Sequence, residues 1–325
     1  EYERLFEVFA AHDIGYFFYN GGGDSQDTTY KVSQMAKKLK FPLQCIGIPK
    51  TVDNDLPFTD CSPGFGSVAK YVATSTLEAG LDVKSMTETS TKVFILEVMG
   101  RHAGWIAAAS CLAATEAGDP PHIILLPEVP FEKAKFISQV KQTVKNNGYC
   151  VIVASEGTQT KNGKFLADSG TTDAFGHKQL GGVAPVLASM ISKIGLKNHW
   201  AVADYLQRSA RHIASKTDLD QAYAVGKHAV KLAISGETAV MPVIKRISNT
   251  PYKWKIETAP LKNIANVEKT MPKNFISKNG FEITSSGKRY LSPLIVGEAP
   301  CFFKNGIPDV ASLKKYLVKK KLKNF

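Results

Sequence analysis

Short apolar segments alternate with segments of helical periodicity through the first half of the chain, and this alternation constrains the fold more than any other feature. Each apolar segment is followed by a polar or glycine-containing loop, as expected where a buried strand ends. Such an order predicts parallel sheets covered on both faces by helices. The apolar segments span residues 14–19, 43–48, 92–98, 122–126 and 149–154, and the helical segments span residues 28–39, 66–81, 103–114 and 131–146.

The second half of the chain has a more helical pattern that ends in a lysine-rich segment. Helices are predicted at residues 182–194 and 219–234, and a strand at residues 238–247. A mixed, hairpin-rich extension follows at residues 251–286, and residues 313–323 are predicted to form an amphipathic helix.

The chain of 325 residues is long enough to form two compact lobes. We place the first lobe at residues 1–88 and the second at residues 89–235, from which the chain crosses back. Residues 236–325 hold the mixed extension and the basic C-terminal helix. The chain opens on a helical pattern at residues 1–13. A doubly wound domain normally opens on a strand whose first turn binds phosphate, so we expect that strand and turn to be missing.

The charge balance and the cysteines exclude several classes of protein. The chain has 41 Lys+Arg and 29 Asp+Glu, but six of the lysines lie in residues 313–323, which are more typical of a solvated helix than of a nucleic-acid-binding tail. The remaining excess suits small anionic substrates, and no nucleic acid is expected as a partner. The five cysteines are scattered without a CxxC spacing, which argues against disulfides and zinc. No apolar run could cross a bilayer and the first residues do not resemble a secretory signal, so we expect a cytoplasmic protein without a membrane partner.

The loop at residues 49–56 follows the apolar run 43–48 and combines two carboxylates, a hydroxyl and an amine. Loops at the carboxyl ends of strands are where open α/β sheets bind ligands. Asp53 can accept a proton from an alcohol, Asp55 can hold a metal ion or orient a neighbour, and Lys50 can neutralise charge on a phosphoryl group during transfer. The alternative interpretation is a solvated polar turn, because Asn and Asp are common turn residues.

A second candidate loop, at residues 20–25, places three glycines between a strand and a helix. Glycines there let backbone amides approach an anion, although a tight turn is the alternative interpretation. The GxGxxA pattern at residues 64–69 follows a loop and not a strand, so it is more typical of a helix start than of a dinucleotide site. The chain has no GxxxxGKS or GxxxxGKT motif and no HExxH motif, which excludes a P-loop and one class of zinc enzyme.

Six short motifs occur in order along the chain. They are Gly21-Gly22-Gly23-Asp24-Ser25, Pro49-Lys50-Thr51-Val52-Asp53-Asn54-Asp55, Pro63-Gly64-Phe65-Gly66, Glu97-Val98-Met99-Gly100-Arg101, Ser155-Glu156-Gly157 and Phe175-Gly176-His177-Lys178-Gln179-Leu180-Gly181-Gly182. Together they resemble the phosphofructokinase family over most of the chain. The resemblance implies two three-layer α/β/α sandwich lobes with mainly parallel sheets. It also implies Mg²⁺-dependent transfer of a phosphoryl group to the 1-hydroxyl of fructose 6-phosphate.

The resemblance implies a role for each motif. Asp53 is the implied base, with Thr51 and Asp55 beside it. The residues implied to bind the sugar phosphate are Met99, Gly100, Arg101, Glu156, His177, Tyr205, Gln207 and Arg208. By the same resemblance the first lobe binds the phosphoryl donor and the second lobe binds the sugar phosphate. Because members of the family share sites between subunits, we expect a homodimer or homotetramer.

Two positions resemble the pyrophosphate-dependent branch of the family. ATP-using relatives have glycine where Asp24 and Lys50 stand here. A carboxylate at Asp24 would lie where the α-phosphate of ATP must go, and two like charges about 4 Å apart repel by roughly 4 kcal/mol at an effective dielectric constant near 20. Pyrophosphate, held near Gly21 and Gly22, ends before that clash, and Lys50 can stabilise the charge on its bridging and leaving oxygens. The expected partners are therefore fructose 6-phosphate and pyrophosphate.

The chain departs from the family pattern at three positions. At one of them, Leu180 replaces an arginine found in many ATP-using relatives, so that Arg208 with Arg211 would supply the cation instead. Gly23 stands where relatives carry a metal-binding Asp or Asn, so either Asp24 holds Mg²⁺ or pyrophosphate and water hold the ion almost alone. Lys92 stands where many relatives have an arginine that reaches into a neighbouring subunit's site, and it would bind the sugar phosphate as a weaker point charge.

The expected absence of the first strand and turn leaves alternatives open. The chain is a shortened piece, or another segment completes its site, or it is a non-catalytic homologue that binds sugar phosphates. Intact Asp53 and Lys50 argue against the non-catalytic homologue. An enzyme of the NAD-kinase or lipid-kinase type is a further alternative, but it is not expected to carry the Met99-Gly100-Arg101 motif.

Overall fold

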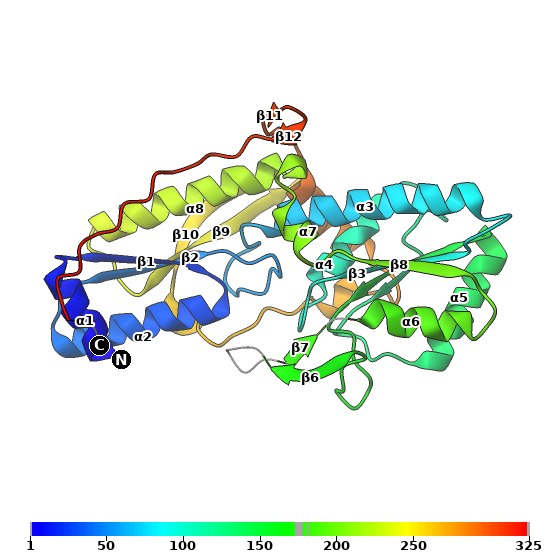
Figure 1. Ribbon diagram of the computed structural model, residues 1–325, viewed down its shortest axis with the longest axis horizontal. Coiled ribbons are helices and arrows are strands. Elements are labelled where there is room, and N and C mark those ends of the chain that lie inside the picture. The colour runs from blue at the N-terminus through cyan, green and yellow to red at the C-terminus, as the bar shows by residue number, and fades with distance from the viewer. Residues whose placement is uncertain (1, 173–177, 181, 324–325) are drawn as a thin grey trace.

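Two four-stranded sheets, one in each of two lobes, organise the molecule (Figure 1). The structure is a computed structural model that describes residues 2–172, 178–180 and 182–323. The strands span β1 Tyr16–Gly21, β2 Gln44–Pro49, β3 Val93–Val98, β4 Ile123–Leu125, β5 Cys150–Ser155, β6 Asp168–Thr172, β7 Lys178–Leu180, β8 Asn198–Val202, β9 Val240–Asn249, β10 Tyr252–Pro260, β11 Phe303–Lys304 and β12 Ile307–Pro308. The order is β1-β2-β9-β10 in the first lobe and β4-β5-β3-β8 in the second.

Helices cover both faces of the first sheet. The α-helices of the chain span α1 Tyr2–Ala11, α2 Gly23–Leu39, α3 Phe65–Met86, α4 Trp105–Ala109, α5 Lys133–Asn147, α6 Val183–Ser192, α7 Asp204–Ser209, α8 Lys216–Ile234 and α9 Ser285–Leu291. In Figure 1, α2 and α8 lie on opposite sides of the sheet. Successive side chains of β2 point to opposite faces, so Cys45 packs on the α2 side whereas Ile46 packs against α8.

The second sheet has the same three-layer arrangement, and its four strands are parallel. Leu96 and Val98 of β3 pack with α3 and α4 on one face, whereas Val93 and Ile95 pack with α5 and α6 on the other. The strand is buried on both faces because all its side chains are apolar except Glu97. Two three-layer lobes with mainly parallel sheets confirm the predicted fold class.

The chain passes between the lobes more than once. α3 leads into the second lobe, and α8, β9 and β10 later complete the first (Figure 1). β9 joins the sheet through parallel pairing of Val240 with Ile46 of β2. The first lobe is therefore built from two distant parts of the chain. The boundaries at residues 1–88, 89–235 and 236–325 stay predictions.

The helix predicted over residues 313–323 is wrong, because residues 309–323 form neither helix nor strand. In Figure 1 this red segment runs in extended form over the first lobe to α1, where the Arg4 guanidinium donates a hydrogen bond to the Lys323 carbonyl oxygen. Neighbouring lysines repel one another at helical spacing, and the apolar side chains here remain exposed, as Leu317 does. No helix among the described residues has both the length and the apolar character that a membrane crossing requires.

Candidate active site

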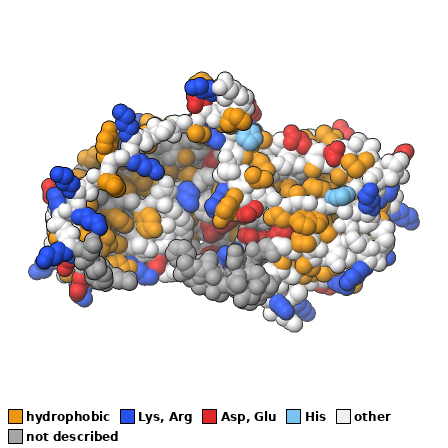
Figure 2. Space-filling model, in the orientation of Figure 1, with side chains coloured by type: hydrophobic (Ala, Val, Ile, Leu, Met, Phe, Trp, Pro, Cys, Tyr) orange, Lys and Arg blue, Asp and Glu red, His pale blue; other side chains and the backbone are white. Residues whose placement is uncertain are grey.

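Residues that directly follow β1, β2, β3 and β5 line one cavity of about 760 Å³. Acidic and basic side chains gather near the junction of the lobes in Figure 2. The lining has five carboxylates and two arginines, so its formal charge is negative although the whole chain is basic. These charged residues are Asp24, Asp53, Asp55, Glu156, Glu268, Arg101 and Arg208. Four of the six motifs, those at residues 21–25, 49–55, 97–101 and 155–157, therefore meet at one site.

The loop that follows β2 carries Lys50, Thr51, Asp53 and Asp55. The Lys50 amide donates to the Gly21 carbonyl oxygen at 3.1 Å, which ties the loop to the end of β1. The buried Gln26 side chain donates to the same carbonyl at 2.8 Å. Within the loop, the Thr51 hydroxyl accepts from the Asp53 amide at 3.1 Å. These hydrogen bonds hold the loop that carries Asp53 against the end of β1, close to where α2 begins.

Asn54 lies between Asp53 and Asp55 and is fully buried. Its φ is 54°, a conformation that Asn tolerates better than most residues with a side chain. Its Oδ1 accepts from the Ser62 amide at 2.9 Å, and its Nδ2 donates to the Tyr290 hydroxyl at 3.1 Å. Because Asn54 is held from both ends of its amide, the directions of the two flanking carboxyl groups are restricted.

The surroundings of the Asp53 carboxyl group disfavour its charge. Burial raises its pKa from the ordinary 3.8 to about 7, and the negative charges of Asp55 and Glu156 add to this effect. Arg101 and His102 lower the pKa. A carboxyl group with a pKa near neutrality can accept a proton and release it at physiological pH.

Asp55 and Glu156 share this environment, and burial raises the pKa of both. The Oδ1 atom of Asp55 is buried and has no hydrogen-bond partner among the described residues. An unpaired buried acceptor is costly, so it marks a place where an ion, a ligand or water can bind. The carboxylate of Glu156 accepts from the Gly100 amide at 3.2 Å.

Two glycine turns bring Arg101 to the cavity. At Gly100, φ is 131° and an added Cβ would lie 2.7 Å from the Ala103 carbonyl oxygen. At Gly157, after β5, an added Cβ would lie 1.9 Å from the Arg101 carbonyl oxygen. Only glycine allows backbones to approach this closely. The turn after β3 therefore packs directly on the turn after β5, and Arg101 lines the cavity with Glu156.

The helix α7 carries three of the residues implied to bind the sugar phosphate, Tyr205, Gln207 and Arg208, and it packs against β3. Gln207 is buried, and its Oε1 accepts from the Met99 amide at 3.4 Å. The guanidinium carbon of Arg208 lies 4.1 Å from the centroid of the exposed Tyr205 ring. Stacking restricts the arginine side chain but leaves its N–H groups in the plane available to an anion.

The candidate donor residues lie on two adjoining cavities. Gly22 and Asp24 line the main cavity, where α2 begins without a side-chain cap. Amides in the first turn of a helix lack intrahelical acceptors and attract anions. Lys50 is exposed and lines a second cavity of about 640 Å³. The wall that both cavities share consists of Thr51, Asp53 and Arg208.

Lys92, one of the predicted site residues, is not among the residues that line the cavity. Lys92 precedes β3, at the end of the sheet opposite to Arg101, and its ammonium group donates to the Thr87 carbonyl oxygen. Its predicted contact with a neighbouring subunit's substrate stays a prediction. His177 lies outside the described residues.

Sequence reasoning missed the segment at residues 266–268, which also lines the cavity. The Glu268 carboxylate lies 2.9 Å from Nδ1 of His102, and the Asn266 amide donates to the Asp27 carboxylate of α2 at 3.0 Å. This segment belongs to the mixed extension and carries no motif. Residues 266–268 reach the cavity because the chain returns from the first lobe to the second at this point.

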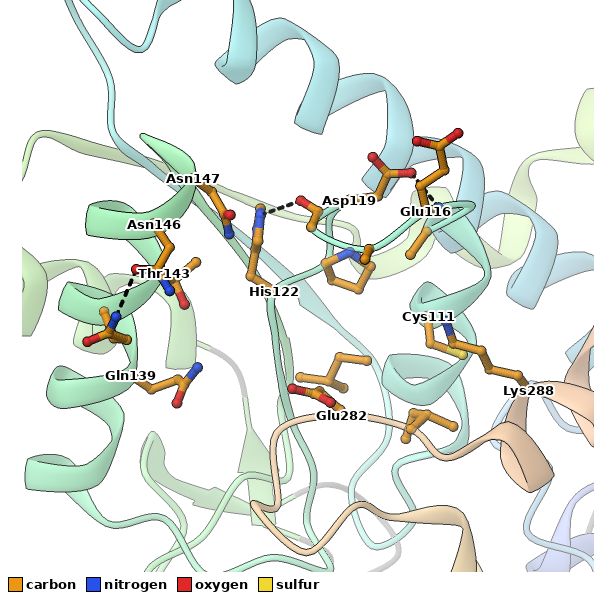
Figure 3. Close-up of a pocket in the computed structure, with 17 residues that line it drawn as sticks. Cys111, Glu116, Asp119, His122, Gln139, Thr143, Asn146, Asn147, Glu282 and Lys288 are labelled. Carbon is orange, nitrogen blue, oxygen red and sulfur yellow. Dashed lines mark hydrogen bonds between the residues drawn. The ribbon is translucent and has the colours of Figure 1, made fainter.

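A separate cavity of about 370 Å³ lies in the second lobe (Figure 3). In Figure 3, amide side chains of α5 face His122 across it. Its lining holds three carboxylates, Glu116, Asp119 and Glu282, against one cation, Lys288. Burial lowers the pKa of His122, so its imidazole adds no positive charge at neutral pH. This charge balance is unfavourable for a phosphorylated ligand.

Comparisons with known proteins identify the family of the chain. A model of the phosphofructokinase family matches residues 1–233. A protein of Halomonas elongata named pyrophosphate–fructose 6-phosphate 1-phosphotransferase is 64% identical over 100% of this chain and 78% of its own length. A relative of the same name from Rhodospirillum rubrum is 38% identical over 98% of this chain and 78% of its own length.

A solved structure agrees as well. It is a pyrophosphate-dependent phosphofructokinase from Marinobacter aquaeolei, which superposes with a TM-score of 0.91 at 61% identity and covers 99% of this chain and 78% of that one. The family resemblance carried by the motifs is thereby confirmed. The chain belongs to the phosphofructokinase family.

Proposed function

We propose that this protein transfers a phosphoryl group from pyrophosphate to the 1-hydroxyl of fructose 6-phosphate, which gives fructose 1,6-bisphosphate and phosphate. The observation that carries the proposal is the position of Asp53. It lies in one cavity with the uncapped start of α2 and with Arg101, so a base, a donor site and an acceptor cation face one another. The names of the similar proteins point to the same reaction.

Asp53 acts as the base. Its carboxylate accepts the proton of the 1-hydroxyl as that oxygen attacks a phosphorus atom of pyrophosphate. The bond from this phosphorus to the bridging oxygen breaks, and orthophosphate leaves with the bond's electron pair. The raised pKa of Asp53 makes it a stronger base than an ordinary carboxylate.

The second lobe binds the sugar phosphate. Arg101 and the stacked Arg208 supply the positive charge for its phosphate, because a guanidinium fork matches phosphate oxygens. Glu156 accepts hydrogen bonds from sugar hydroxyls. The Met99 and Gly100 backbone, with Tyr205 and Gln207, shapes the wall that holds the sugar. Lys92 of a partner subunit contributes only if the chain assembles.

The first lobe selects the donor. The amides at the start of α2, from Gly22 onward, bind pyrophosphate oxygens, and the Asp24 carboxylate repels the α-phosphate that ATP would place there. Lys50 acts from the adjoining cavity across the wall of Thr51 and Asp53 and stabilises charge that develops on the leaving phosphate.

The residues fit Mg²⁺ bound mainly by the substrate. No group of three or more Asp, Glu, His or Cys side chains in the described part of the chain is placed to hold a metal ion. Mg²⁺ often binds through one or two carboxylates plus substrate phosphates, and Asp24 and the unpaired Oδ1 of Asp55 are available. When bound, the ion neutralises phosphate charge in a cavity whose lining is net negative.

We further propose a cytoplasmic homodimer or homotetramer, with neither nucleic acid nor membrane as a partner. Size-exclusion chromatography with light scattering measures the assembly, and a monomer at micromolar concentration would contradict it.

The test compares donors at fixed fructose 6-phosphate and Mg²⁺. Purified chain is assayed with pyrophosphate and with ATP in the direction of fructose 1,6-bisphosphate, and the Asp53→Asn variant serves as the inactive control. We expect turnover with pyrophosphate and little with ATP. Turnover with ATP alone would refute the assignment of pyrophosphate as the donor. No turnover with either donor would refute the proposed function.

A further inference from the structure

Residues 266–271 form a segment that returns from the first lobe to the second and lines the candidate active site on its way. We call it the crossing segment. It follows η3 (Leu261–Asn263) of the first lobe and precedes η4 (Lys273–Phe275) of the second. In Figure 1 this orange chain runs between the two lobes. None of the sequence motifs includes it.

The crossing segment is hydrogen-bonded to both lobes. Near its start, Asn266 donates to Asp27 of α2. Near its end, the Met271 amide donates to the Glu128 carboxylate at 3.2 Å, and the Trp105 indole donates to the Lys269 carbonyl oxygen at 3.1 Å. The segment is therefore fixed at both ends and can transmit a position from one lobe to the other.

Lys269 is the centre of this segment. The residue is partly exposed, but its ammonium group lies deep, against the inner side of the loop after β2. The three N–H donors have three acceptors: Oδ1 of Asn54 at 3.2 Å and the carbonyl oxygens of Thr59 and Asp60 at 3.1 and 3.0 Å. The backbone amide of Lys269 also donates to the Asp55 carbonyl oxygen at 2.6 Å.

These acceptors fall on both arms of the loop that carries the candidate base. Asn54 separates Asp53 from Asp55, whereas Thr59 and Asp60 lie where the loop turns back. An ammonium group that binds both arms holds their separation, and a neutral side chain of the same length could not saturate three acceptors. Burial lowers the pKa of Lys269 to about 8, and the charges of Asp60 and Asp55 act in the opposite direction and favour the ammonium form.

We propose that Lys269 is a positioning residue for phosphoryl transfer: through Asn54 it fixes the direction of the Asp53 carboxylate. The proposal rests on the proposed function, because it assigns Lys269 a role only in a reaction where Asp53 is the base. A displacement of reacting groups by about 1 Å costs on the order of 100-fold in rate. The hydrogen bonds of Lys269 go to the loop after β2 and not to Arg208 or Glu156, so we expect its replacement to affect the direction of Asp53 more than the binding of the sugar phosphate.

The test uses three variants of the full chain. Lys269→Met removes the charge at nearly constant length, Lys269→Arg keeps it, and Lys262→Met removes an exposed lysine of η3 as the matched control. We expect Lys269→Met to lower kcat roughly 10- to 100-fold while KM for fructose 6-phosphate changes less than about threefold. Lys269→Arg should recover part of the loss, and Lys262→Met should equal the unchanged chain.

A second variant keeps the proposal testable if Lys269→Met does not fold. Tyr290→Phe removes the hydroxyl that accepts from Asn54 and leaves every charge in place. It should lower kcat severalfold with KM for fructose 6-phosphate unchanged. An unchanged kcat in folded Lys269→Met or in Tyr290→Phe, or a rise in KM alone, would overturn the positioning role. Failure of the unchanged chain with both pyrophosphate and ATP would refute the proposed function itself, and the role of Lys269 with it.

Discussion

Replacement of Asp53 by asparagine is expected to stabilise the protein while it removes activity. The amide keeps the size of the carboxyl group but carries no charge, so the unfavourable burial of an anion disappears. Because Asp53 is the proposed base, kcat should fall roughly 100- to 10,000-fold. A gain in stability together with a loss of activity is what is expected when a residue is retained for catalysis although it destabilises the folded protein.

The magnitude follows from the pKa of Asp53. A rise from 3.8 to about 7 means that the folded state holds the proton more tightly than the unfolded state does. The stability that this proton provides is fully present below pH ~4 and is lost as pH rises toward about 7. Three pKa units correspond to an upper limit of about 4 kcal/mol, and solvent relaxation around the carboxylate reduces it to roughly 1–2 kcal/mol.

The assay is thermal unfolding of the unchanged chain and of Asp53→Asn at about pH 5.5 and about pH 8. The variant should have the higher apparent Tm at both values, and its advantage should be larger at the higher pH by an amount on the order of 2–4 °C. Asp82→Asn, on an exposed position of α3, is the matched control and should show no such change. An advantage that does not grow with pH, or a less stable Asp53→Asn, would refute the argument.

Three further results are expected. Lys50→Gly should lower pyrophosphate turnover by about 100-fold or more and leave the dissociation constant of fructose 6-phosphate unchanged; equal loss of both would assign the lysine a structural role. Asp24→Gly should gain measurable turnover with ATP, and ATP turnover that stays at the level of the unchanged chain would show that another group excludes the nucleotide. The plot of log kcat/KM for fructose 6-phosphate against pH should rise by about one per pH unit below pH ~7 and flatten above it, because only ionised Asp53 accepts the proton; a rate that is flat down to pH ~5 would contradict this role.

Local patterns were sufficient to predict much of the fold. The apolar runs identified β2, β3 and β5 within a few residues, because a strand buried on both faces has an unbroken apolar sequence. The loops that follow neighbouring strands of one parallel sheet lie at the same edge, so the proximity of Arg101 and Glu156, after β3 and β5, could be inferred from the pattern. Asp53 follows β2 of the other sheet, so only the family resemblance predicted that it joins them.

Long-range contacts could not be predicted in the same way. Nothing in the local sequence of β9 indicates that Val240 pairs with Ile46, or that Lys269 reaches the loop after β2. The environment of Lys269 is assembled by the return of the chain, and its neighbours in sequence are ordinary loop residues. The prediction of a terminal helix was wrong for a different reason. Helical periodicity does not stabilise a helix by itself: the lysines repel one another, and no apolar face of the segment packs on the rest of the described chain to offset this repulsion.

The central claim, that Asp53 activates the 1-hydroxyl of fructose 6-phosphate toward pyrophosphate, is tested most directly by ³¹P NMR. The unchanged chain and Asp53→Asn are each incubated with fructose 6-phosphate, pyrophosphate and Mg²⁺. We predict that the unchanged chain consumes pyrophosphate and forms equal amounts of fructose 1,6-bisphosphate and orthophosphate, while Asp53→Asn leaves both reactants in place over the same time. Equal product formation by Asp53→Asn, or orthophosphate without a new sugar phosphate ester, would contradict the claim.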